Sequence, residues 1–177
     1  VSSFNTKKVT MMDSMFYELS SIRKLDLSNF DTSQVVSMPT MFSGDVMLDD
    51  LNISSFNTSK VENMSRMFAD CRSLTILNLN HFNTENVNNM ASMFNGMTNL
   101  ASLNISSFNT QNVRDMSGMF SQVQKIEHLD LSHFRTDKVT NMGSMFHQMT
   151  ALKTINLSNF NTANVTDMSS MFLMDDN

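Results

Sequence analysis

The sequence predicts an α/β repeat solenoid, a right-handed coil with a parallel β-ladder on one face and short helices on the other. The first observation is a unit, typified by residues 51–68, that recurs seven times at a fixed interval of 26 residues. The second is that all 14 Phe fall in two columns of this unit, and 14 of the 19 Met fall in two others. A fixed period of this length indicates repeats that bury their apolar faces only against their neighbours. We therefore expect residues 1–177 to form a single array of seven repeats, the first and last incomplete, within a longer chain.

The strand of each repeat is predicted from the opening Leu48-x-x-Leu51-x-Ile53, whose last part alternates with period two as in a half-buried strand. Parallel strands need a long crossover between them, and the remaining ~20 residues of each period supply one. The strands should thus form the rungs of one parallel ladder. The predicted rungs are Leu25–Leu27, Leu51–Ile53, Leu77–Leu79, Leu103–Ile105, Leu129–Leu131 and Ile155–Leu157.

A short helix is predicted after the strand. Val61, Met64, Met67 and Phe68 follow one another at spacings of three, three and one, which place them on one helical face. An Asx residue precedes the first Met of most repeats, where its side chain would cap the helix N-terminus. These expected caps are Asn63, Asn89, Asp115, Asn141 and Asp167. The variable residues 69–73 are read as a loop, and the single Cys there gives no disulfide framework and no paired-thiol metal site.

The core is predicted from the apolar columns. Met fills irregular apolar gaps, so Met columns in step with Leu, Val and Phe columns indicate packing rather than metal handling. The inward positions expected in one repeat are Leu48, Leu51, Ile53, Phe56, Val61, Met64, Met67 and Phe68.

The unit L-x-x-L-[DN]-[LI]-S-x-F-x-T-x-x-V-x-x-M-x-x-M-F resembles the BspA-like leucine-rich-repeat surface proteins of bacteria. The resemblance covers the whole chain and implies a leucine-rich-repeat-like coil in an extracellular protein of the bacterial cell surface. It also implies adhesion to host or neighbour-cell components. Phe56 and its equivalents replace the Asn or Cys of the general leucine-rich repeat, so the Asn ladder that bonds loop backbones is absent. We expect the Thr column to bond part of that backbone instead; it comprises Thr6, Thr32, Thr58, Thr84, Thr110, Thr136 and Thr162.

Strand alternation leaves an outward face with an Asx column beside a variable column. This face could serve only solubility and stiffness, or it could recognise a ligand, as exposed faces of repeat arrays do. In the second interpretation, amide and hydroxyl groups suit a glycan or an extended polypeptide, and the variable column gives specificity. Ile76 and His128 stand out in that column. The candidate ligand-binding residues are Lys24, Asp26, Asp50, Asn52, Ile76, Asn78, Ser102, Asn104, His128, Asp130, Thr154 and Asn156.

Several function classes are disfavoured. The net charge of −5 offers no stripe to neutralise phosphates, which argues against nucleic acid. No apolar run approaches the ~18 residues of a membrane-spanning helix, so direct membrane insertion is not expected. One carboxylate per rung is a weak cage for calcium, and His81 and His133 lie two repeats apart, so no metal or cofactor is expected. The sequence lacks the hydrolase motif G-x-S-x-G, the metalloprotease motif H-E-x-x-H and a Gly-rich phosphate-binding loop, which predicts a protein without enzymatic activity.

The sequence therefore favours a non-catalytic adhesion module of a bacterial cell-surface protein that recognises protein or glycan through its exposed strand face. The alternative is a rigid spacer that projects another domain from the cell surface. End-to-end self-association through the open ends of the array is a third possibility.

Overall fold

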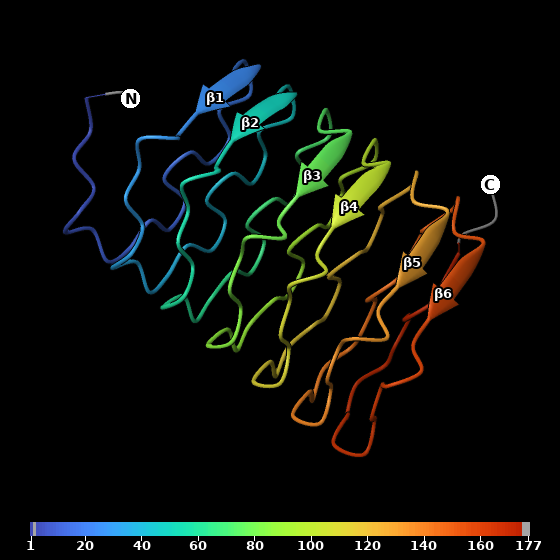
Figure 1. Cartoon of the computed structure of the whole chain (residues 1–177). Coiled ribbons are helices and arrows are strands. Elements are labelled where there is room, and N and C mark those ends of the chain that lie inside the picture. Colours follow the sequence, from blue (N-terminus) through green and yellow to red (C-terminus); the bar gives the residue numbers. More distant parts are fainter. Residues whose placement is uncertain (2, 175–177) are drawn as a thin grey trace.

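Short parallel strands recur once per repeat along the chain. The computed structural model describes residues 1 and 3–174, in which successive repeats stack side by side from the N-terminal to the C-terminal end (Figure 1). Paired strands align one repeat apart, as Lys24 with Asp50, which confirms the predicted parallel register. Each strand begins one residue earlier than the predicted rung. The strands are β1 (Lys24–Asp26), β2 (Asp50–Asn52), β3 (Ile76–Asn78), β4 (Ser102–Asn104), β5 (His128–Asp130) and β6 (Thr154–Asn156).

The strands do not form the single six-rung ladder that the sequence predicts. They form three two-stranded sheets, β1–β2, β3–β4 and β5–β6. No Cα atom of β2 lies within 8 Å of a Cα atom of β3, and the same holds for β4 and β5. Figure 1 shows this arrangement as three pairs of arrows with wider intervals between them. We call these two intervals the β2–β3 seam and the β4–β5 seam.

The predicted short helices are wrong: none of the residues that the structure describes is helical. The segment after the strand instead forms a second, continuous parallel ladder, with a bridge in every repeat. The N–H of Met64 donates to Asn89 O at 3.0 Å, and the N–H of Phe68 donates to Met93 O at 3.0 Å. Such bonds require neighbouring repeats about 4.8 Å apart. A helix is about 10 Å wide with its side chains, so helices could not stack at that spacing. The bridged positions are Met11, Ser37, Asn63, Asn89, Asp115, Asn141 and Asp167.

Two consecutive β-turns replace the predicted helix, as residues 64–71 illustrate. The N–H of Met67 donates to Met64 O and the N–H of Cys71 donates to Phe68 O, both at 3.2 Å. The third residue of each turn, Arg66 or Asp70, is left-handed, with φ of 56° and 59°. A left-handed third residue is characteristic of type II turns. Spacings of three, three and one therefore put apolar side chains on one side of a turn pair as well as on one side of a helix.

The Asx residues predicted as helix caps close turns instead. Asn63 Oδ1 accepts from Ser65 N at 2.9 Å, and Asn89 Oδ1 accepts from Ala91 N at 2.9 Å. An Asx side chain that bonds the backbone two residues further on mimics a backbone turn. These side chains are therefore local acceptors, as predicted, but the element that they serve is a turn at a corner of the repeat.

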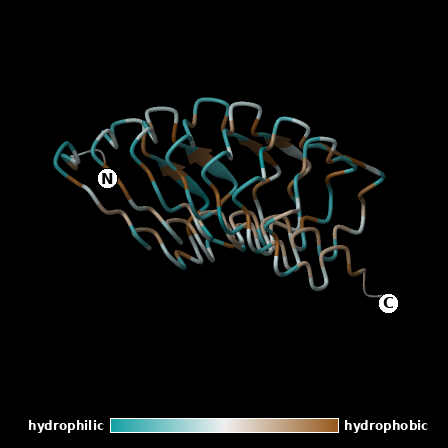
Figure 2. Ribbon diagram, turned by 90° about the horizontal axis from the view of Figure 1, so that it is seen from below, coloured by the Kyte–Doolittle hydropathy of each residue, from teal (hydrophilic) through white to brown (hydrophobic). Residues whose placement is uncertain are grey.

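The core lies between the strands and the second ladder, as predicted from the apolar columns. Hydrophobic residues run along the inside of the stacked repeats, as Figure 2 shows from below. Seven of the eight predicted inward positions of the repeat at residues 48–73 are buried, and Leu51 is only half-buried. One further core column was missed because its residues vary in type within the segment read as a loop. Its buried members are Asp45, Cys71, Met97, Val123 and Met149.

The predicted role of the Thr column is confirmed. Thr84, which is fully buried, donates through Oγ1 to Asn109 O at 3.0 Å and accepts from Asn109 N at 2.8 Å. Every Thr of this column from Thr6 to Thr136 makes the same pair of bonds to the next repeat. One Thr hydroxyl thus satisfies both the N–H and the C=O of a residue in the next repeat. The Phe that replaces the usual Asn could not make these bonds.

Candidate binding site on the strand face

The candidate residues occupy the first and third positions of every strand. None of the twelve is buried, so the outward orientation that the sequence predicts is present. The first residue of each strand is exposed, and the third is exposed or half-buried. The middle residue of each strand packs against the core. These residues form one exposed surface over the six strands, which we call the strand face.

Part of the variable column pairs across joined strands. Lys24 Nζ donates to an Asp50 carboxylate oxygen at 3.1 Å across β1–β2, and His128 Nδ1 lies 2.8 Å from Thr154 Oγ1 across β5–β6. Exposed ion pairs of this kind contribute about 0–1 kcal/mol. These four residues therefore have partners within the chain, and the variation in this column partly reflects pairing. The preceding column adds the ion pairs Arg23–Asp49 and Glu127–Lys153.

The Asx column is also used by the fold. Asp26 Oδ1 accepts from Ser28 N at 3.0 Å, and the equivalent Asp130 Oδ1 accepts from Ser132 N at 2.9 Å. These backbone N–H groups hold the pKa of both carboxyl groups below the ordinary value. The Asx oxygens therefore serve the turn that follows each strand.

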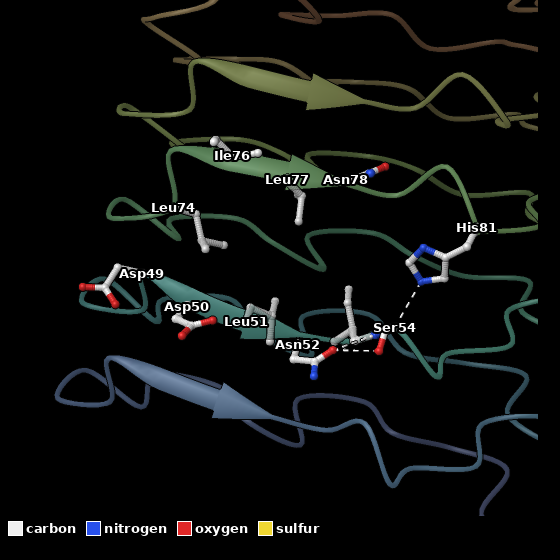
Figure 3. A pocket seen from close by; sticks show the side chains of 11 residues that line it. Asp49, Asp50, Leu51, Asn52, Ser54, Leu74, Ile76, Leu77, Asn78 and His81 are labelled. Carbon is white, nitrogen blue, oxygen red and sulfur yellow. Dashed lines mark hydrogen bonds between the residues drawn. The ribbon is translucent and has the colours of Figure 1, made fainter.

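A pocket of about 410 Å³ opens on the strand face at the β2–β3 seam (Figure 3). Ile76 stands at its edge with 68 % of its surface exposed, the most exposed large hydrophobic side chain of the described residues. A volume of this size falls within the ~300–1,000 Å³ range of ligand pockets. The lining combines carboxylate, amide, hydroxyl, imidazole and apolar groups: Asp49, Asp50, Leu51, Asn52, Ile53, Ser54, Leu74, Ile76, Leu77, Asn78 and His81.

His81 spans one end of this pocket. Its Nε2 lies 3.1 Å from Ile53 O and, because a carbonyl only accepts, carries the proton. The ring packs edge-on against Phe82, with centroids 5.0 Å apart and planes at 88°. His133 makes the same contact with Ile105 O at the β4–β5 seam.

The structure brings four predicted residues into the pocket, Asp50, Asn52, Ile76 and Asn78, and places the other eight elsewhere on the strand face. Ile76 and His128, which the sequence singled out together, belong to different sheets. Sequence reasoning considered His81 only as a metal ligand and missed it as part of a pocket. An available signal was the alternation of the segment before each Phe, since Leu-Asn-Ile-Ser-Ser-Phe occurs identically at 51–56 and 103–108 but not between them.

Metal and membrane features are not found in the part of the chain that the structure describes. No cluster of three or more His, Cys, Asp or Glu residues there could hold a metal ion. Within the same residues, no helix is long and apolar enough to cross a bilayer.

The fold and the strand face define a repeat protein built from short parallel strands and stacked turns. A family model described as "Mycoplasma protein of unknown function, DUF285" matches residues 1–102 and, in a second match, residues 73–176. The chain belongs to this family. No curated protein and no solved structure matches the chain.

Proposed function

We propose that this chain is a non-catalytic binding module that recognises a protein or glycan partner through the strand face. The observation that carries the proposal is the pocket at the β2–β3 seam, which lies among the residues predicted to bind a ligand. It places an exposed apolar side chain, Ile76, in the same lining as carboxylate, amide and imidazole groups. That combination is typical of recognition sites rather than of surfaces that serve solubility alone.

The rest of the chain supports the pocket as a scaffold. In this proposal the repeats form a right-handed solenoid of the leucine-rich-repeat type, in which each repeat contacts only its neighbours. The Thr bonds and the second ladder fix every repeat to the next at hydrogen-bond distance. Side chains on the strand face are thereby held by a rigid support, which lowers the ordering cost of binding.

The proposed setting is the bacterial cell surface, with a host or neighbour-cell component as the partner. The support is the BspA-like signature in the sequence together with membership of the DUF285 family. A rigid, acidic strand face with a net charge of −5 on the chain also fits a protein or glycan better than nucleic acid.

A binding screen tests this function. The full chain is applied to arrays of glycans and of extracellular-matrix proteins, in parallel with Ile76→Glu and with Arg114→Glu, an exposed residue beside the second ladder. We expect at least one ligand whose binding falls tenfold or more in Ile76→Glu and stays unchanged in Arg114→Glu. A ligand equally sensitive to both changes, or none at all, would contradict the proposal.

The spacer function is the second candidate, and the uninterrupted second ladder favours it. A ladder bridged in every repeat from Met11 to Asp167 gives the stack one continuous stiff side. Removal of two adjacent repeats in register from the full-length protein would distinguish the functions. A spacer keeps its activity at reduced reach, whereas a binding module loses its ligand when the removed repeats include β2 and β3.

A further inference from the structure

We propose that the β2–β3 seam takes an extended polypeptide segment, which enters as an added strand between β2 and β3. This inference rests on the proposed function and names the class of ligand at the same pocket. Three features carry it: unpaired backbone groups on both sides of the seam, the width of the seam, and the side chain that keeps it open.

The backbone groups that face the seam come from both strands. Asp50 N donates to Arg23 O at 3.1 Å and Leu27 N donates to Asn52 O at 2.9 Å, so residues 50 and 52 bond toward β1. Alternate residues of a parallel strand bond to opposite sides, so the N–H and C=O of Leu51 point toward β3.

The same reasoning applies to β3, on the other side of the seam. Ser102 N donates to Thr75 O at 3.1 Å and Leu79 N donates to Asn104 O at 2.8 Å, so the backbone of residues 75 and 79 faces β4. The N–H and C=O groups of residues 76 and 78 therefore face β2. Among the described residues, no backbone bond joins β2 to β3. Unpaired groups in this order are a template for another strand.

The seam is wider than the interval between two joined strands. Neighbouring strands lie about 4.8 Å apart, so a strand bonded to both walls requires the walls to be about 9.6 Å apart. The Cα atoms of β2 and β3 are more than 8 Å apart at every position, and the pocket occupies the space between them. The seam is therefore wider than the ladder spacing of the joined sheets, which leaves no room for another chain, and in this proposal one extended chain occupies it.

The residue before the first Phe of the repeat differs between the seams and the joined pairs β1–β2 and β3–β4, and in this proposal it keeps the seam open. Where β1 joins β2, Ser55 Oγ donates to Leu27 O at 3.0 Å and to Phe30 O at 2.9 Å, so a short side chain bridges close repeats. At the β2–β3 seam, the equivalent residue is His81, whose ring reaches Ile53 O with its far nitrogen. Ser107 joins β3 to β4 and His133 lies at the β4–β5 seam, so both seams have His at this position.

The side chains around the seam specify the chemistry of the segment. An added strand in register would direct one side chain inward, level with the half-buried Leu51 and the buried Leu77. Its neighbours along the strand would point outward, between Asp50 and Ile76 and between Asn52 and Asn78. The expected ligand is a segment that alternates an inward apolar residue with outward residues, at least one of them polar to meet the two amides.

The test uses selection of displayed random peptides on the immobilised full chain, followed by binding of a selected synthetic peptide to three forms of the protein. His81→Ser copies the residue that joins β1 to β2 and should close the seam, with peptide affinity reduced tenfold or more. His133→Ser changes the other seam and should leave the affinity unchanged. Thermal unfolding of each variant verifies that it is folded.

Amide hydrogen exchange supplies a readout that does not depend on a variant. Bound peptide should slow exchange at the amides of residues 51, 76 and 78, and N-methylation of alternate peptide residues should abolish binding. The inference is overturned if no peptide is selected, if His81→Ser binds equally well, or if those amides exchange unchanged. A glycan that binds in an Ile76-dependent manner without peptide binding would overturn it while leaving the proposed function standing.

Discussion

Replacement of Thr84 by Val tests the hydroxyl ladder that joins the repeats. Val has nearly the shape of Thr but lacks the Oγ1 that bonds both the N–H and the C=O of Asn109. Each lost hydrogen bond costs about 1 kcal/mol net, and a buried group left unsatisfied costs about 1–3 kcal/mol. With two backbone groups affected at a fully buried position, the free energy of unfolding should fall by about 2–4 kcal/mol.

Urea denaturation monitored by circular dichroism measures this change, and the chain contains its own control. Thr162 is in the same column but is exposed, and its hydroxyl has no following repeat to bond within the described residues. Thr162→Val should therefore change stability by no more than about 0.5 kcal/mol. Equal effects of the two substitutions would refute the structural role assigned to the buried hydroxyl.

Three further predictions follow from the core. Burial raises the pKa of Asp45 to about 6, so the stability that its protonated form contributes is present below pH ~4 and is lost as the pH rises through 6. Asp45→Asn keeps an acceptor for Leu19 N, so between pH 4 and 7 the variant should gain about 3 kcal/mol in unfolding free energy relative to the wild type. Urea titrations at several pH values measure this gain, and a difference that stays constant with pH would contradict the assignment. Met67→Ala should cost about 2–5 kcal/mol in the same assay, because Met67 is fully buried, and a loss below 1 kcal/mol would mean that the site collapses around the smaller side chain. Dilute hydrogen peroxide should oxidise the exposed Met11 and Met47 well before Met67, as peptide mass spectrometry can show, and early oxidation of Met67 would mean that the core opens readily.

The repeat, the core and the hydroxyl ladder could be predicted because they depend on side chains that recur at every period. Phe56 occupies a place where a backbone partner is needed, and the next polar residue, Thr58, can supply it. The strand was predictable for the same reason, since Leu51 and Ile53 alternate with polar residues. The strand, the core columns and the Thr bonds each depend on residues that are close in sequence or that recur at the same position of every repeat.

The turns and the seams could not be predicted by the same reasoning. Met64, Met67 and Phe68 fit a helix by spacing, and the decision against a helix comes from the hydrogen-bond distance between repeats, which no single repeat reveals. The seam also involves a contact between repeats, since the ring of His81 bonds Ile53 O across it. When single repeats are aligned at 26 residues, His81 stands at a position that varies in type. Reading the repeats in pairs reveals that Ser and a larger side chain alternate at this position through residues 55, 81, 107 and 133.

Because the strands pair two by two, the structural unit of the array is two repeats, whereas the sequence period is one repeat. Removing one of the central repeats would place a Ser where a His stood, or the reverse, in the part of the stack where these two residues alternate, from Ser55 to His133. Removing two repeats restores the order. The array can therefore keep its order of joined and open strands only if it is shortened or extended in steps of 52 residues, twice the 26-residue repeat.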